Sequence, residues 1–450
     1  MKKLLVITLF SLCSLIDATV SAQNWNPVGS GMNADVDALA VYNGDLYAGG
    51  YFTLAGGVSV NNIAQWNGSG WSVVGTGITG ANALVYALAV YNGNLYAGGQ
   101  FTTAGGNAAT NIAMWNGTAW SAVGSGITGA GSYVYALTVY NGSLIAGGYF
   151  ATAGGNPASN IAAWNGTTWT ALGSGINANG IASLTVFDSV LYAGGQFTTA
   201  GGNPAANIAQ WNGSTWSALG TGLTGSFVDG NCLAIYKHAL YAAGYFDTAG
   251  GVKANYVASW NGTKWDSVLS GFQLGWGAPR AMTVANGQLY VGGGMSKAGG
   301  MNINNMASWN GTKWDSVGSG FQDTGVYALC VYNSELYAGG IFESSGSTTT
   351  DYIARWNHIT GINNINEIAN SLDAYPNPSR GQLTIKSAVA SGKSSVKVYN
   401  VLGEQVYSQL STSNAEVSVN LSSQPNGVYL YRVFGDSGNL IGEGKLMIQK

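Results

Sequence analysis

Charge is scarce in this sequence. Asp, Glu, Lys and Arg make up 8% of its 450 residues, the formal net charge is −3, and residues 46–187 contain none of the four. Nucleic-acid binding needs clustered Lys and Arg to neutralise phosphates, so the composition argues against it. A surface of Asn, Ser, Thr, Gly, Tyr and Trp suits neutral polar ligands instead, above all sugars, whose apolar faces stack on aromatic rings.

Cysteine and histidine are also rare, with three and two residues respectively. Cys232 and Cys330 each replace a small residue in apolar runs that are not adjacent, so we expect free, buried thiols rather than a disulfide. His238 and His358 lie in or beside short turns, which argues against a metal site or a Ser-His relay. We therefore expect no cofactor, no metal and no catalytic residues.

Long apolar runs are missing after the first residues. Residues 4–16 are apolar, Lys2 and Lys3 precede them, and Val20, Ser21 and Ala22 follow as small residues suited to cleavage. This order predicts a secretory signal peptide over residues 1–22. Because no later run reaches membrane-spanning length, we expect no transmembrane segment in the mature chain.

Glycine and tryptophan are abundant, with 69 and 15 residues, and they recur with a fixed period. The tripeptide Trp-Asn-Gly begins at Trp66, Trp115, Trp164, Trp211, Trp260 and Trp309, and a seventh copy has His358 in place of the glycine. Copies are about 48 residues apart, a period typical of units that bury apolar surface by stacking on their neighbours.

Each unit is predicted to contain four short strands. In the second unit the apolar or small-residue runs cover residues 86–91, 95–101, 111–115 and 120–123. Asn-Gly pairs separate the first run from the second and the third from the fourth, and Asn-Gly favours two-residue hairpins because both residues accept positive φ. Double glycines such as Gly98-Gly99 let neighbouring backbones approach closely.

The two ends of the array are incomplete in complementary ways. The segment at Trp25 matches the fourth run of a unit but has no preceding runs, whereas the last unit loses the pattern after its third run at Trp356. Docking the first on the second would complete a seventh sheet and cover two exposed edges. We therefore predict an all-β fold with a seven-bladed propeller over residues 23–357, the alternative being an open solenoid.

The repeats resemble kelch repeats over about three quarters of the chain. The double glycine after the second strand, the aromatic residue that ends the third and the tryptophan of the fourth carry this resemblance. Two features depart from it: four residues separate Trp66 from Trp71, where kelch units have six between the two aromatics, and Ala243 interrupts one double glycine. The resemblance implies a kelch-like propeller and leaves function open, since such propellers serve as enzymes, lectins and protein-binding platforms.

The composition changes after a linker over residues 358–371. Alternating runs at residues 382–386, 395–399 and 428–433 predict a small β-sandwich over residues 372–450. This segment resembles the type A C-terminal sorting domain of the type IX secretion system, through Pro376, Asn377, Pro378, Gly381, Gly403, Gly427, Tyr429 and Lys445. The resemblance implies the type IX machinery as a partner, and a protein that passes through the periplasm to be secreted or kept on the outer cell surface.

One position differs from unit to unit where its neighbours stay Ala, Leu or Val. Aligning the units places Asp37, Tyr86, Tyr135, Ala182, Asn231, Arg280 and Tyr327 there, where the first strand leaves the face with the longer loops. Functional residues gather on such loop faces. We predict a ligand-binding ring at the channel mouth, with Asp229 and Trp276 on adjacent loops; the alternative is drift at a half-exposed position.

The function predicted from these features is a non-catalytic, monomeric binding module, with glycans as the favoured ligands. A protein-binding adhesin and an extracellular carbohydrate-active enzyme are the alternatives. Glycoside hydrolysis needs paired carboxylates, and Asp35, Asp37, Asp229 and Asp323 are too scattered along the chain to nominate a pair.

Four further positions resemble the O-glycosylation sequon of bacteria that have this secretion system. In each, a hydroxyl residue follows Asp and precedes a small aliphatic residue; they are Ser189, Thr248, Ser267 and Ser316. The same residues are also ordinary choices for turns and strand starts.

Overall fold

The computed structural model describes residues 24–225, 232–322, 325–356, 374–386, 394–400, 405–411, 416–435 and 440–450. Its regular elements are antiparallel β-strands, so the all-β prediction is confirmed for this part of the chain. No helix there is long and apolar enough to cross a membrane. The chain divides into two compact units, Met1–Ile359 and Thr360–Lys450, and the expected signal peptide and linker lie outside the described residues.

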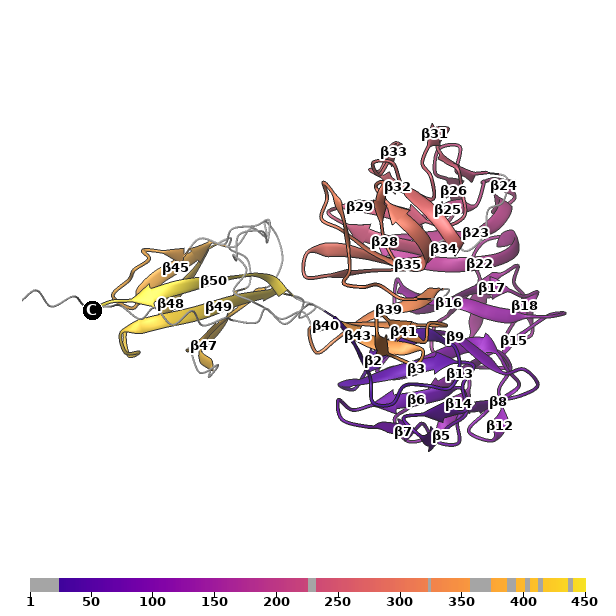
Figure 1. Ribbon diagram of the computed structural model, residues 1–450, viewed down its shortest axis with the longest axis horizontal. Coiled ribbons are helices and arrows are strands. Elements are labelled where there is room, and N and C mark those ends of the chain that lie inside the picture. Colours follow the sequence, from indigo (N-terminus) through magenta and orange to yellow (C-terminus); the bar gives the residue numbers. More distant parts are fainter. Residues whose placement is uncertain are drawn as a thin grey trace, which may run out of the picture. The chain divides into compact units, whose positions relative to one another are not determined.

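Seven sheets of the first unit share one four-stranded path (Figure 1). The first three sheets are β2 (Val36–Tyr42), β3 (Asp45–Gly50), β6 (Ile63–Trp66), β7 (Trp71–Val73); β9 (Leu84–Tyr91), β10 (Asn94–Gln100), β13 (Ile112–Trp115), β14 (Trp120–Ala122); and β16 (Tyr133–Tyr140), β17 (Ser143–Tyr149), β20 (Ile161–Trp164), β21 (Trp169–Ala171). Short strands in the connections, such as β8 (Ile78–Thr79) and β11 (Thr103–Ala104), pair beside these sheets.

The remaining four sheets follow the same plan. They are β22 (Ile176–Phe187), β23 (Val190–Ala200), β25 (Ile208–Trp211), β26 (Trp216–Ala218); β28 (Cys232–Tyr236), β29 (Ala239–Ala243), β32 (Val257–Trp260), β33 (Trp265–Ser267); β34 (Phe272–Ala285), β35 (Gln288–Ala298), β37 (Met306–Trp309), β38 (Trp314–Ser316); and β39 (Val326–Tyr332), β40 (Glu335–Gly340), β43 (Ile353–Trp356), β1 (Trp25–Pro27). The fourth and sixth sheets carry one extra short strand each.

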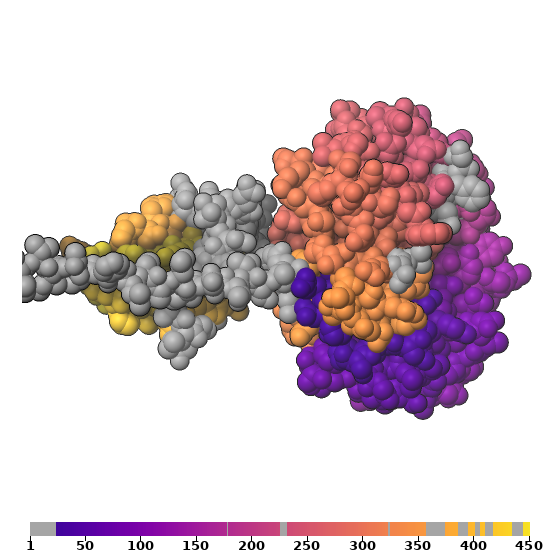
Figure 2. Space-filling model, viewed as in Figure 1, coloured from indigo at the N-terminus to yellow at the C-terminus, as the bar shows by residue number. Residues whose placement is uncertain are grey.

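The strand at the start of the described chain completes the last sheet. β1 pairs antiparallel with β43, so that Trp25 faces Trp356 and Pro27 faces Ala354. In Figure 2 the indigo residues at the start of the described chain lie against the orange residues of the seventh sheet. Each of the two incomplete repeat units thus supplies what the other lacks, and the edge of β43 is covered.

Six of the repeated tryptophans link one sheet to its neighbour from inside the core. The indole nitrogen of Trp71 donates to the carbonyl of Val28 at 2.9 Å, and that of Trp25 donates to Val317 at 3.1 Å. Equivalent bonds start from Trp120, Trp169, Trp216 and Trp265. All of these rings are buried. Buried indoles usually find such a partner, and the burial of these rings shows that they belong to the fold rather than to a binding surface.

The double glycines have two separate physical causes. A Cβ on Gly49 would lie 2.5 Å from Cγ1 of Val85 in the second sheet, and one on Gly339 would lie 2.4 Å from Cγ1 of Val36 in the first. A Cβ on Gly50 would instead lie 2.0 Å from the carbonyl oxygen of Asp35, within the same sheet. The first glycine therefore permits close packing of adjacent sheets, and the second makes room for an irregularity in the first strand.

The two kinds of Asn-Gly turn differ, which corrects the expectation of two identical hairpins. Between the first two strands, Asn43 and Gly44 both have positive φ, 50° and 86°, as a two-residue hairpin requires. After Trp66 the loop has four residues, and the side-chain oxygen of Asn67 accepts from the backbone of Ser69 and Gly70. The Ser69 hydroxyl donates to the same oxygen at 2.8 Å, so the Asn-Gly-Ser triplet is an Asx turn.

The second unit contains two sheets around one hydrophobic core. The smaller sheet consists of β44 (Ala374–Tyr375), β45 (Gln382–Lys386) and β48 (Glu416–Asn420), and the larger of β47 (Gln405–Ser411), β46 (Ser394–Tyr399), β49 (Gly427–Gly435) and β50 (Leu440–Ile448). Ile385 from the smaller sheet and Val396 and Val433 from the larger are fully buried in that core.

Candidate functional site

Six of the seven aligned ring positions share one backbone feature, a β-bulge in the first strand of their sheet. The pairing with the second strand skips Asp37, Tyr86, Tyr135, Ala182, Arg280 and Tyr327. A bulge leaves its extra residue unpaired and turns its side chain away from the regular pleat. Asn231, the remaining ring position, lies outside the described residues.

Five of the bulge residues and Tyr133 gather in one cluster, which we name the mouth cluster after its predicted position: Asp37, Tyr86, Tyr133, Tyr135, Arg280 and Tyr327. Three of its tyrosines pack against one another. The ring centroid of Tyr135 is 4.3 Å from that of Tyr86 and 4.5 Å from that of Tyr133. Tyr133 is not among the predicted residues, and its hydroxyl donates to the carbonyl of Asn179 at 3.2 Å. Burial raises the pKa of Tyr86, and Tyr135 adds to the rise. The phenol of Tyr86 therefore stays neutral at physiological pH.

Arg280, Asp37 and Tyr327 form the rest of the mouth cluster. The guanidinium carbon of Arg280 lies 5.0 Å from the ring centroid of Tyr327, a cation–π contact. Burial and the charge of Asp35 raise the pKa of Asp37 and the charge of Arg280 lowers it, which leaves this pKa at about 7. No ion pair joins Asp37 to Arg280 among the described residues, and the Oδ2 atom of Asp37 is buried without a hydrogen-bond partner there.

The other predicted site residues have different fates. Trp276, on β34, is 88% exposed and offers a free aromatic surface. Asp229 and Asp323 lie outside the described residues. Across the described ranges no three His, Cys, Asp or Glu side chains gather as they would around a metal ion. Cys232 is buried, Cys330 is half-buried, and both are free thiols.

The hydroxyl residues of the O-glycosylation prediction occupy varied positions. Ser189 is exposed in a turn with φ of 61°, and Ser267 and Ser316 are exposed at the ends of β33 and β38. Thr248 is half-buried, and its hydroxyl shares a hydrogen bond with that of Thr224. Three of the four hydroxyls are therefore accessible to modification.

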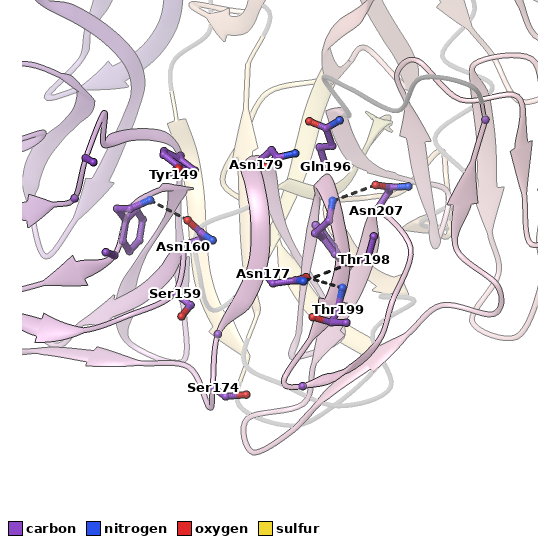
Figure 3. A pocket seen from close by; sticks show the side chains of 18 residues that line it. Tyr149, Ser159, Asn160, Ser174, Asn177, Asn179, Gln196, Thr198, Thr199 and Asn207 are labelled. Carbon is purple, nitrogen blue, oxygen red and sulfur yellow. Dashed lines mark hydrogen bonds between the residues drawn. The ribbon is translucent and has the colours of Figure 1, made fainter.

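A groove of about 1130 Å³, missed from the sequence, runs between the third and fourth sheets (Figure 3). Its lining contains no charged residue. Asn177 and Asn179 on β22 lie between Tyr149 on one side and Gln196 on the other. One sequence signal for it existed, because the residue after the double glycine, or after Ala243-Gly244, is Tyr or Gln in five successive units: Tyr51, Gln100, Tyr149, Gln196 and Tyr245.

Several amide side chains that line this groove already form hydrogen bonds with the protein backbone. The side chain of Asn160 accepts from the backbone of Phe150 at 2.9 Å and donates to the carbonyl of Ile176 at 2.8 Å. The side-chain oxygen of Asn177 accepts from the backbone of Thr199 at 2.7 Å. Within the described ranges, the side-chain amides of Asn179 and Gln196 have no protein partner, and both residues are exposed.

The sorting-motif residues hold the two ends of the second unit together. The side chain of Asn377 donates to the carbonyl of Lys445 at 3.0 Å and accepts from the backbone of Met447 at 2.8 Å. Gly381 has φ of 100°, and a Cβ there would lie 2.6 Å from the Cα of Ser422. The hydroxyl of Tyr429 donates to the carbonyl of Pro425. Pro376 and Pro378 follow cis peptide bonds, Gly427 begins β49, and Gly403 lies outside the described residues.

Residues 373–449 match the family model described as the secretion system C-terminal sorting domain. The chain thus carries a type IX sorting domain behind an all-β, propeller-like unit. This domain indicates export to the cell surface or secretion, as found in Bacteroidetes, and it implies the secretion machinery as a partner. No curated protein matches the chain.

The chain is also similar to solved extracellular structures. One is PorZ, a surface component of the type IX secretion system of Porphyromonas gingivalis (14% identity, 92% of this chain and 66% of that one, TM-score 0.37). Two are extracellular domains from B. thetaiotaomicron. The domain of a hybrid two-component system has 10% identity over 95% of this chain and 57% of that one, with a TM-score of 0.49. The domain of a one-component system has 10% identity over 95% of this chain and 59% of that one, with a TM-score of 0.40. The chain spans less than two thirds of each of these three proteins.

Proposed function

We propose that the first unit is a closed, seven-bladed, kelch-like propeller. The shared path of its seven sheets supports this proposal, as does the pairing of β1 with β43. The tight approach of Gly339 in the seventh sheet to Val36 in the first supports closure as well. The bulge residues would then surround one channel mouth.

We propose that this protein is an exported, non-catalytic module that binds neutral glycans at the mouth cluster. The observation that carries the proposal is the gathering of four phenols, one carboxyl and one guanidinium on a unit whose residues 46–187 carry no charged side chain. Sugars suit this chemistry, since their hydroxyls hydrogen-bond to carboxyl and guanidinium groups while their apolar faces stack on tyrosine rings.

A second candidate, hydrolysis of glycosides, is supported by Asp37 of the mouth cluster and the nearby Asp35. The charge of Asp35 helps to raise the pKa of Asp37, which is about 7 and suits a general acid. Recognition of a surface protein by the same face is the remaining alternative. Release of reducing sugar by the wild-type protein, lost in Asp37→Asn, would favour the enzyme over the binding module.

The binding proposal is tested on a glycan array with the mature chain, residues 23–450, followed by calorimetry on the best ligand. Arg280→Ala, and Tyr86→Ala combined with Tyr135→Ala, should each weaken binding by about 1–3 kcal/mol through lost hydrogen bonds and stacking. Their melting temperatures should barely change, because the substituted side chains are exposed or half-buried.

Two controls separate binding from folding. Lys264→Ala removes an exposed charge on the loop before β33 and should change neither affinity nor stability. Trp164→Ala removes a buried core ring and should destabilise the fold by about 3–5 kcal/mol. If the mouth variants lose stability and keep affinity, those residues serve packing, and the site lies elsewhere.

A further inference from the structure

The mouth cluster and the groove between the third and fourth sheets are joined through Tyr133. The ring of Tyr133 lies 4.5 Å from that of Tyr135 in the mouth cluster and 5.7 Å from that of Tyr149 on the groove. Its hydroxyl bonds the backbone of Asn179, which lines the groove beside Tyr149. The two regions are therefore neighbours connected by continuous contacts.

We propose that mouth and groove form one extended site for a neutral oligosaccharide, with the groove as an additional subsite. The inference rests on the proposed glycan binding and adds a preference for chains over single sugars. The groove measures about 1130 Å³, slightly above the range of ordinary ligand pockets, and so exceeds what one sugar ring fills.

The chemistry of the groove suits an uncharged chain. Tyr149 is 39% exposed and offers an aromatic face, while the exposed amides of Asn179 and Gln196 offer donors and acceptors for hydroxyls. A charged polymer would find no counter-charge, because the lining contains none.

The groove is also rigid. Asn160 links the third sheet to the fourth through its bonds to Phe150 and Ile176, and the equivalent Asn207 bonds Phe197 and Leu223. Asn177 fixes the backbone of Thr199. A surface held by such bonds loses little freedom when it binds, which favours affinity for a weakly interacting neutral ligand.

The test uses cellohexaose, xylohexaose and mannohexaose, each beside its disaccharide, with the mature chain in calorimetry. The wild type should bind at least one hexasaccharide about tenfold more tightly than the matching disaccharide. Tyr149→Ala and the pair Asn179→Ala with Gln196→Ala should remove that difference and leave disaccharide affinity unchanged. Arg280→Ala should weaken both ligands.

Tyr245→Ala is the matched control. Tyr245 follows Ala243-Gly244 as Tyr149 follows its glycines, has the same 39% exposure, and does not line the groove. It should leave both affinities unchanged. Tyr149→Phe, which keeps the ring, should restore the preference and exclude misfolding as a cause. A hexasaccharide preference that survives Tyr149→Ala, or no preference at all, overturns this inference alone. Failure of the wild type to bind any of the six sugars overturns the proposed function as well.

Discussion

The carboxyl of Asp37 is the group at the mouth whose protonation changes near neutral pH. Its protonation changes in this range because the bulge places its side chain among half-buried tyrosines instead of in water. Burial penalises the charged form first, and the nearby Asp35 adds repulsion. The mouth thus carries one more negative charge above neutral pH than below it.

This arrangement makes stability depend on pH. Because the pKa of Asp37 is raised from 3.8 to about 7 on folding, the folded state binds a proton that the unfolded state has lost. The stabilisation is full below the unfolded pKa and disappears as the pH rises through about 7. We expect the melting temperature of the wild type to fall between pH 4 and pH 7, relative to that of Asp37→Asn.

Thermal melts of both proteins at half-unit pH intervals check this expectation. Asp45→Asn serves as the control, since this acid sits at the start of β3 outside the mouth cluster, and its melting curve should follow that of the wild type. Parallel curves for the wild type and Asp37→Asn would show that Asp37 is well solvated.

Residue roles were only partly predictable from the sequence. Alignment of the repeats found Asp37, Arg280 and three of the four tyrosines, because bulge positions vary while core positions do not. It could not find Tyr149 or Gln196, since their importance depends on a groove between two separate sheets. Asn160 also lines the groove, and its side chain bonds the backbone of Phe150 and Ile176.

Among the single elements, we expect β1 to contribute strongly to the stability of the first unit. Trp25 is 1% exposed, its ring lies 4.6 Å from that of Phe321 and 5.4 Å from that of Trp356, and its indole bonds Val317. A strand of three residues therefore contributes a large buried ring and a row of backbone hydrogen bonds to the seventh sheet.

Deleting residues 24–31 should therefore lower the free energy of unfolding by several kcal/mol, through the lost ring and the lost ladder bonds. Denaturant unfolding and thermal melts measure the change. Asn26→Ala keeps the strand and should behave like the wild type. A deletion variant that melts within about two degrees of the parent would contradict the closure proposal.

The repeat was enough to predict the strands of each unit, but it did not predict the turn between the third and fourth strands. The alternation of apolar runs and Asn-Gly pairs was enough to predict four strands per unit. It could not separate the hairpin at Asn43 from the Asx turn at Asn67, because the same dipeptide allows both and the spacing of Trp66 and Trp71 decides between them.

For the whole molecule, the sorting domain and the propeller-like unit have separate cores. Removing residues 372–450 should leave the first unit folded, and the truncated protein should remain in the periplasm. Fractionation of cells followed by immunoblotting locates the protein. Gly381→Ala should have a similar effect without any deletion, since its Cβ would clash with Ser422. Normal extracellular levels of the truncated chain would contradict the role of this domain.

The pairing of β1 with β43 also sets the order in which the molecule can be finished. A ribosome makes Trp25 among the first of the described residues, yet the partner strand at Ile353–Trp356 comes only after all other strands of the first unit. The sorting domain follows at once, over residues 373–449. A chain that carries the sorting domain has therefore already received every strand of the first unit, whereas a chain that ends before residue 373 lacks the sorting domain.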